Sequence, residues 1–211
     1  MSNLEGLYHA ILTGDAKNAE AITRDALAAG ADPSELVSRY MTPAMDEVGR
    51  RFECNEYFVP ELLIAARAMK VALGLMLPQL TAKGVQRAGR VVIGTVQGDL
   101  HDIGKNLVAS LLEGGGFEVI DLGVDVPAEK FVAAVREKEG TILALSALLT
   151  TTMTKMKTVI DALTNAGLRE KTKVIVGGAP ITQQFANQIG ADGFSDNANG
   201  AVTLARKLLA V

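Results

Sequence analysis

The chain has 211 residues with 21 basic and 24 acidic side chains, and its formal charge of −3 argues against nucleic acid or an anionic membrane as a partner. Charges interrupt its apolar runs well short of the ~18 residues of a membrane span, and no basic flank leads into an apolar segment at the N-terminus, so we expect a cytoplasmic protein. The single cysteine, Cys54, excludes an internal disulfide, and two histidines are too few for a His-rich metal site.

Roughly the first 80 residues show helical periodicity and no strand pattern. Two short helices are predicted, the second ending at Gly30. A third is predicted to start at Asp32–Glu35, where Asp32 can cap free amides, and Pro43 either bends this helix or marks its true beginning. A fourth, starting near Val59, is apolar enough to be the centre of a bundle.

The polar segment Thr81–Gly89 loses the apolar period, so it is predicted to link two domains, residues 1–88 and 89–211. After it, β-branched runs alternate with helical segments, which indicates a parallel sheet covered on both faces. Strands are predicted at Val91–Val96, Glu118–Leu122, Ile142–Leu145, Val174–Val176 and Gly193–Ser195, and helices at Ile103–Leu112, Phe131–Val135, Met153–Leu163, Ala186–Ile189 and Val202–Leu209. We therefore predict an N-terminal four-helix bundle followed by a flavodoxin-like (Rossmann-type) α/β domain with a five-stranded parallel sheet, which binds ligands beyond the carboxyl ends of its strands.

The loop after the first predicted strand, Gly98–Asn106, does not fit either phosphate-binding motif. Five residues separate Gly98 from the Gly104-Lys105 pair, where a P-loop has four, and Asn106 stands in place of the metal-binding hydroxyl. The second glycine of the dinucleotide fingerprint is also missing.

The same loop places His101 at a strand end, with Asp99 two residues before it. Imidazole is a good ligand for transition metals, and Asp99 or Asp102 could hydrogen-bond to its second ring nitrogen. The alternative is an ordinary loop histidine, with Asp102 capping the helix that starts at Ile103. Since one side chain cannot hold a free metal ion, a metal bound here would arrive in a cofactor that supplies its other ligands.

Asp99-x-His101-x-x-Gly104 resembles the D-x-H-x-x-G signature of cobalamin-binding domains, which hold the corrinoid base-off with a histidine on cobalt. Ser146–Thr150 is similar to the second, S-x-L element of these domains, and Val176–Ala179 is similar to their glycine pair. Each element follows its expected strand.

The N-terminal half carries the resemblance further. Val48–Phe52 and Tyr57–Leu62 resemble the helical cap of cobalamin-dependent methionine synthase and of the small corrinoid proteins of methyltransferase systems. In the cap, Phe52 and Val59 match positions that cover the upper, methyl-bearing face of the cofactor, although each could also be ordinary bundle core.

The resemblance implies a cobalamin cofactor, methylcobalamin when loaded, with His101 as the axial metal ligand in place of dimethylbenzimidazole. It implies that Asp99 is the hydrogen-bond partner of His101, and that Thr152 occupies the position where the family relays protons through a serine. The other cofactor-binding residues that it implies are Gly98, Leu100, Asp102, Ile103, Gly104, Ser146, Leu148, Thr150, Gly177 and Gly178. The glycine pair could instead serve only a tight turn.

The implied function is that of a methyl carrier, one subunit of a multicomponent system. Co(I) would take a methyl group from a methylamine, betaine, methanol or an aryl methyl ether held by a substrate-specific methyltransferase. A second methyltransferase would pass the group to tetrahydrofolate or coenzyme M, and a reductive activase would be a third partner. A corrinoid-binding sensor or regulator is an alternative, although the sequence shows no DNA-binding helix pair. So is the small subunit of an adenosylcobalamin mutase, although such subunits usually lack the cap.

Overall fold

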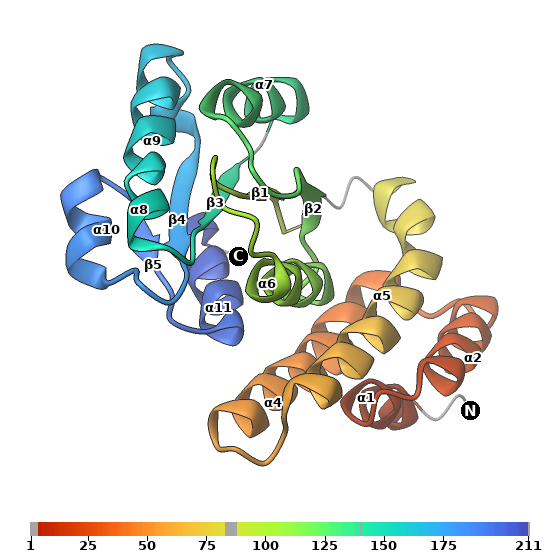
Figure 1. Cartoon of the computed structure of the whole chain (residues 1–211). Coiled ribbons are helices and arrows are strands. Elements are labelled where there is room, and N and C mark those ends of the chain that lie inside the picture. Colours follow the sequence, from red (N-terminus) through yellow and green to blue (C-terminus); the bar gives the residue numbers. More distant parts are fainter. Residues whose placement is uncertain (1–3, 83–87, 140, 211) are drawn as a thin grey trace. The chain divides into compact units, whose positions relative to one another are not determined.

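The computed structural model describes residues 4–82, 88–139 and 141–210. It comprises two compact units (Figure 1). The first contains residues 1–86 together with 113–116, and the second contains residues 87–112 and 117–211. Residues 83–87 of the predicted linker lie outside the described residues.

The first unit is built from helices. They are α1 (Leu4–Leu12), α2 (Ala16–Ala28), α3 (Pro33–Leu36), a π-helical segment (Val37–Met41), α4 (Thr42–Glu53) and α5 (Val59–Ala82). Asp32 caps α3 as predicted, because its carboxylate accepts the amide of Ser34 at 3.0 Å. The third predicted helix is divided into three segments. Pro43 lies in the first turn of α4, where its missing N–H leaves no internal bond unmade, so it marks the beginning of a helix.

The second unit is a five-stranded parallel sheet with helices on both faces. Its strands are β1 (Arg90–Thr95), β2 (Glu118–Asp121), β3 (Ile142–Ser146), β4 (Lys173–Gly177) and β5 (Gly193–Phe194). Its helices are α6 (Ile103–Gly114), α7 (Ala128–Lys138), α8 (Thr150–Met153), α9 (Lys155–Asn165), a 3₁₀ turn (Arg169–Lys171), α10 (Gln183–Ile189) and α11 (Ala198–Leu209). Figure 1 shows α7 and α9 on one side of the sheet and α6 and α11 on the other.

The strand order β2-β1-β3-β4-β5 confirms the predicted flavodoxin-like arrangement. The direction of the crossovers reverses between β1 and β3, which are neighbours in register from Val91 beside Ile142 to Thr95 beside Ser146. One hydrogen bond beyond the strands, from the Val96 amide to the Ser146 carbonyl at 3.0 Å, continues the ladder. The loops that follow β1 and β3 therefore start side by side, at the edge where such sheets bind ligands.

Buried apolar side chains fix this arrangement. One face of the central strands presents Val92, Leu143 and Val174 to a core that also contains Phe131 of α7 and Met156 of α9. No helix among the described residues is long and apolar enough to cross a membrane.

Candidate functional site

The loop after β1 begins with a tight turn. The Asp99 amide donates to the Val96 carbonyl at 3.1 Å, and Gly98 between them has a φ of +85°. A positive φ at the third residue is typical of a type II turn and favours glycine. The Thr95 hydroxyl then holds the His101 carbonyl at 2.9 Å, so both ends of the segment that carries Asp99 and His101 are fixed to β1.

Asp99 is completely buried, and both of its carboxylate oxygens accept hydrogen bonds. Oδ1 accepts the amide of His101 at 3.1 Å and lies 2.7 Å from Nδ1 of the His101 ring. Oδ2 accepts the Thr152 hydroxyl at 2.7 Å and the amides of Leu148 and Leu149 at 2.8 and 3.4 Å. The structure thus brings together three predicted site residues, Asp99 and His101 from the loop after β1 and Thr152 from α8.

The environment of Asp99 keeps it ionised. Burial by itself would raise the pKa of this carboxyl, but hydrogen bonds from the Thr152 hydroxyl, the Leu148 amide and His101 outweigh it and lower the pKa well below its usual range. An ionised carboxylate can only accept hydrogen bonds, so the contact with His101 requires a proton on Nδ1. In the neutral ring, Nε2 is then the nitrogen with a free lone pair.

The His101 side chain is about half exposed, at 50%, and its Nε2 has no hydrogen-bond partner among the described residues. Large apolar side chains on the same loops are also exposed, including Leu100 at 72% and Ile103 at 86%, together with Leu148 and Leu149. Exposed apolar groups that accompany a free ligand nitrogen are typical of a binding surface. The described residues contain no cluster of three or more metal-ligating side chains. The donor set therefore fits a metal that brings its own equatorial ligands inside a largely apolar group.

The two glycines at the end of β4, Gly177 within the strand and Gly178 after it, lie beside the end of β3 and the loop that follows it. Gly177 is in register with Ser146, and its carbonyl accepts the Ala147 amide at 3.3 Å. Gly178 has a φ of +127°, and a Cβ there would lie 1.9 Å from the Ala147 carbonyl oxygen. The packing of the chain itself therefore requires glycine at 178.

The remaining predicted residues of this unit lie on exposed loop and helix surface. Gly104, in the first turn of α6, is exposed, and a Cβ there would meet nothing within 4 Å. Asp102 accepts the Asn106 side chain at 3.1 Å, and Thr150 opens α8. The space over Gly104 is available to a ligand.

Within the first unit, Phe52 lies near the C-terminus of α4 and its side chain is half-buried. Val59, at the start of α5, is 41% exposed. The turn between these helices contains Asn55 with a φ of +58°. It also carries Phe58, which is 61% exposed, more than either predicted residue. An exposed phenylalanine beside an exposed valine marks this turn as an apolar surface.

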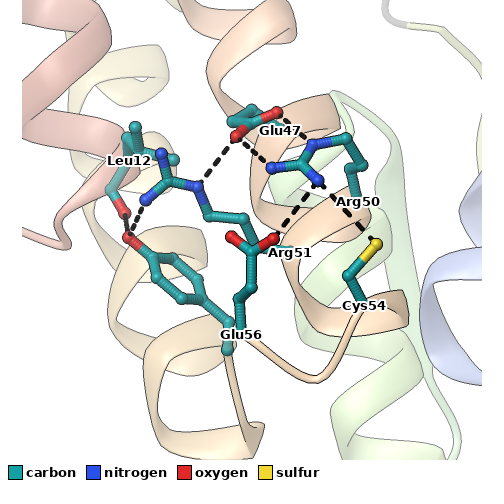
Figure 2. Close-up of polar contacts among 7 residues, drawn as sticks. Leu12, Glu47, Arg50, Arg51, Cys54 and Glu56 are labelled. Atoms are coloured by element: carbon teal, nitrogen blue, oxygen red, sulfur yellow. Dashed lines mark hydrogen bonds and ion pairs between the residues drawn. The ribbon is translucent and has the colours of Figure 1, made fainter.

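A polar network holds that turn (Figure 2). Glu47 accepts hydrogen bonds from Arg50, at 2.7 and 2.8 Å, and from Arg51 at 2.8 Å. These bonds, from Arg50 first and then from Arg51, lower the pKa of Glu47 to about 2. Arg51 also lies over the Tyr57 ring, 5.1 Å from its centroid, and donates to the Tyr57 hydroxyl at 3.1 Å. That hydroxyl donates to the Leu12 carbonyl at 3.2 Å, which ties the turn to α1.

The sequence interpretation missed several residues of the site. Leu149 supplies an amide to Asp99, Thr95 holds the His101 carbonyl, and Phe58 is more exposed than either predicted cap residue. Asp125, in the loop after β2, accepts the Gly98 amide at 2.7 Å. The sequence carries a local signal only for Phe58, which stands beside the predicted Val59, since the other contacts depend on how the loops meet.

Comparison with known proteins finds a family match for each unit. Residues 89–203 match a family described as a B12 binding domain, and residues 4–76 match a second family with the same description. The trimethylamine corrinoid protein of Methanosarcina barkeri is 44% identical over 204 residues, which cover 96% of this chain and 94% of that protein. Dimethylamine corrinoid protein 3 of Methanosarcina acetivorans is 39% identical and covers 99% of this chain and 100% of its own.

Two solved structures share the whole architecture. A cobalamin-binding protein from Desulfitobacterium hafniense has a TM-score of 0.82 at 33% identity, covering 99% of both chains. A chain of the methanol:cobalamin methyltransferase complex from Methanosarcina barkeri has a TM-score of 0.85 at 32% identity, covering 100% of this chain and 81% of that one. The helical unit and the α/β unit therefore occur together in the relatives as well.

Proposed function

This chain belongs to the family of corrinoid proteins that pair a helical and an α/β B12-binding unit, and we propose that it carries methyl groups in a methylamine methyltransferase system with His101 as the axial ligand of cobalt. When bound, the corrinoid supplies a cobalt centre that takes up a methyl group and gives it away. The single observation that carries the assignment of His101 is the bond from its Nδ1 to the buried Asp99 carboxylate, because this bond leaves the exposed Nε2 as the ligand atom.

Asp99 fixes the orientation and the tautomer of the His101 ring. Its Oδ1 holds the ring tautomer in which Nε2 is basic, and a carboxylate partner increases the donor strength of the imidazole. The two amides on Oδ2 hold the carboxylate in place when the ring moves. Asp99 and His101 would thus act as one hydrogen-bonded pair, which could take up a proton if His101 released the metal.

Thr152 fits the relay position. Its hydroxyl lies 2.7 Å from Asp99 Oδ2 and 3.0 Å from the Leu149 carbonyl, yet it has only one hydrogen to donate. When that hydrogen points to the Leu149 carbonyl, Thr152 Oγ1 could accept a hydrogen bond from a protonated Asp99 Oδ2, and the reverse rotation would restore the present bond. Threonine therefore supplies the hydroxyl that a serine would supply at this position, with fewer rotamers available to it.

The apolar side chains complete the binding surface. Leu100, Ile103, Leu148 and Leu149 would pack against the macrocycle, since burying them removes exposed apolar area from water. The pocket for the displaced nucleotide tail would be lined by the remaining predicted residues of this unit, with the open space over Gly104 as its entry. They are Gly98, Asp102, Ser146, Thr150, Gly177 and Gly178. In the helical unit, Phe52 and Val59 would exclude water from the methyl-bearing face, and we add Phe58 to them.

The relatives suggest the methyl donor and the partners. Proteins named for trimethylamine and dimethylamine are 39 to 44% identical to this chain, which favours a methylamine as the methyl donor. That complex also supports docking to a substrate-specific methyltransferase. A second methyltransferase and a reductive activase complete the proposed system. We propose residues 1–88 and 89–211 as its cap and cofactor-binding domains.

Electron paramagnetic resonance of the Co(II) form tests the axial ligand. The protein is labelled with ¹⁵N only at histidine and reconstituted with unlabelled cobalamin. We expect coupling to one ¹⁵N nucleus, and the His101→Ala variant serves as the control that loses it. Coupling to the ¹⁴N of the cofactor's own benzimidazole in the wild-type protein would refute the proposal.

A further inference from the structure

The segment after β2, residues 122–127, has no role in the function described so far, yet it runs along the whole turn that leads to Asp99. The Thr95 amide donates to the Gly123 carbonyl at 3.0 Å, and the Val126 amide donates to the Thr95 carbonyl at 3.0 Å. Val96 and Val126 form a parallel bridge. The segment thus continues the sheet beyond the end of β2.

Within this segment, Asp125 is the residue that contacts the backbone around Asp99. Its Oδ1 accepts the Gly98 amide at 2.7 Å, and its own amide donates to the Asp99 carbonyl at 3.0 Å. One residue therefore holds the backbone on both sides of the Asp99 side chain. Asp125 adopts a φ of +52°, a left-handed conformation that few residues other than glycine, asparagine and aspartate accept readily.

The segment is itself anchored at its start. Asp121 Oδ1 accepts the Gly123 amide at 2.9 Å, and its other oxygen pairs with Lys105 of α6. The Lys105 side chain is only 2% exposed, so this ion pair is well shielded on the lysine side. Asp125 therefore projects from a braced segment, and its contacts can restrain the turn.

We propose that Asp125 is a positioning residue for the axial ligand. It fixes the backbone on both sides of Asp99 and thereby sets the direction in which Asp99 orients the His101 ring. This inference rests on the proposed function, because it concerns how firmly His101 is presented to cobalt. Asp125 acts through the backbone of Gly98 and Asp99.

Three variants separate the hydrogen bond from the backbone conformation. Asp125→Asn keeps an oxygen that accepts the Gly98 amide and tolerates the positive φ. Asp125→Gly removes the acceptor without backbone strain, and Asp125→Ala removes the acceptor and adds strain. The Asn variant is thus the conservative rescue, and the Gly and Ala pair measures the contribution of strain.

Competition with free imidazole gives a readout that depends on ligand positioning. Protein labelled with ¹⁵N-histidine and loaded with cobalamin is titrated with unlabelled imidazole, and the resonance of the Co(II) form distinguishes ¹⁵N from ¹⁴N on cobalt. Loss of a typical hydrogen bond predicts that Asp125→Gly needs about threefold to tenfold less imidazole at the midpoint. Asp125→Asn should stay within about twofold of the wild type.

Hydrogen exchange of the Gly98 amide in the cofactor-free protein is the second readout. We expect faster exchange in Asp125→Gly than in Asp125→Asn. Unchanged exchange in the Gly variant, or a lower melting temperature with an unchanged imidazole midpoint, would overturn the inference. Absence of ¹⁵N coupling in the wild-type protein would instead refute the proposed function, so the two failures are distinguishable.

Discussion

Replacing Thr152 with valine tests how much its hydroxyl contributes to the buried carboxylate. Valine keeps the branched shape and removes the oxygen that lies 2.7 Å from Asp99 Oδ2. A hydrogen bond to a charged group typically contributes about 1.5–3 kcal/mol. Because the Leu148 and Leu149 amides still donate to the same oxygen, we expect a loss near the lower end, about 1.5 kcal/mol.

Native-state hydrogen exchange of the cofactor-free protein measures this loss in the α/β unit separately from the helical unit. Amides of the buried β1 and β3 strands, such as Val92 and Leu143, should exchange about tenfold faster in Thr152→Val, since 1.4 kcal/mol corresponds to a factor of ten. Thr152→Ser retains the hydroxyl and is the matched control. If the valine variant exchanges at the same rate as the serine variant, the hydroxyl does not stabilise Asp99 and the relay loses its structural basis.

Four further outcomes follow from the geometry. The pKa of Glu47 is lowered from 4.5 to about 2, so its contribution to stability is complete above pH 4.5 and is lost as the pH falls toward 2. Circular dichroism should therefore show less acid unfolding over this pH range in Glu47→Gln than in the wild type, each compared with the same protein at neutral pH. Gly104→Ala should leave the melting temperature unchanged or raise it slightly, since the site is open and helical, and should weaken cobalamin binding at equilibrium dialysis. Unchanged cobalamin binding by Gly104→Ala would show that the nucleotide tail does not lie over this residue. Phe58→Ala should accelerate photolysis of bound methylcobalamin while the melting temperature stays within about 2 °C, because an exposed side chain contributes little to stability. Phe52 is half-buried, so for Phe52→Ala a large fall in melting temperature with an unchanged photolysis rate would assign this residue to the bundle core.

Local sequence rules predicted most of the fold. The β-branched runs give β1, β3 and β4 to within one residue at each end, because a strand buried on both faces is a short apolar segment. The π-helical segment at Val37–Met41 could not be predicted, since its apolar spacing is compatible with an α-helix. The break at Thr154 between α8 and α9 could not be predicted either, and the helix predicted from Met153 to Leu163 runs through it.

The site was predicted unevenly for a physical reason. Asp99 and His101 are two residues apart, so their spacing in the sequence already indicates a pair. Thr152 reaches Asp99 from 53 residues away, and only the resemblance to a family indicated it. Asp125 follows a glycine-containing stretch that reads as an ordinary turn, and its contact with Gly98 depends on the register of β1 beside β2.

The adjacency of β1 and β3 also has a consequence for how the protein is made. The ribosome produces Asp99 and His101 about 50 residues before Leu148, Leu149 and Thr152, so the nascent motif has no donors for Asp99 Oδ2 until β3 has emerged and paired. Until then, burial of the ionised carboxylate lacks these three donors and is less favourable. Cofactor loading therefore belongs after completion of the central strands, and a chain that stalls before β3 would not capture a corrinoid prematurely.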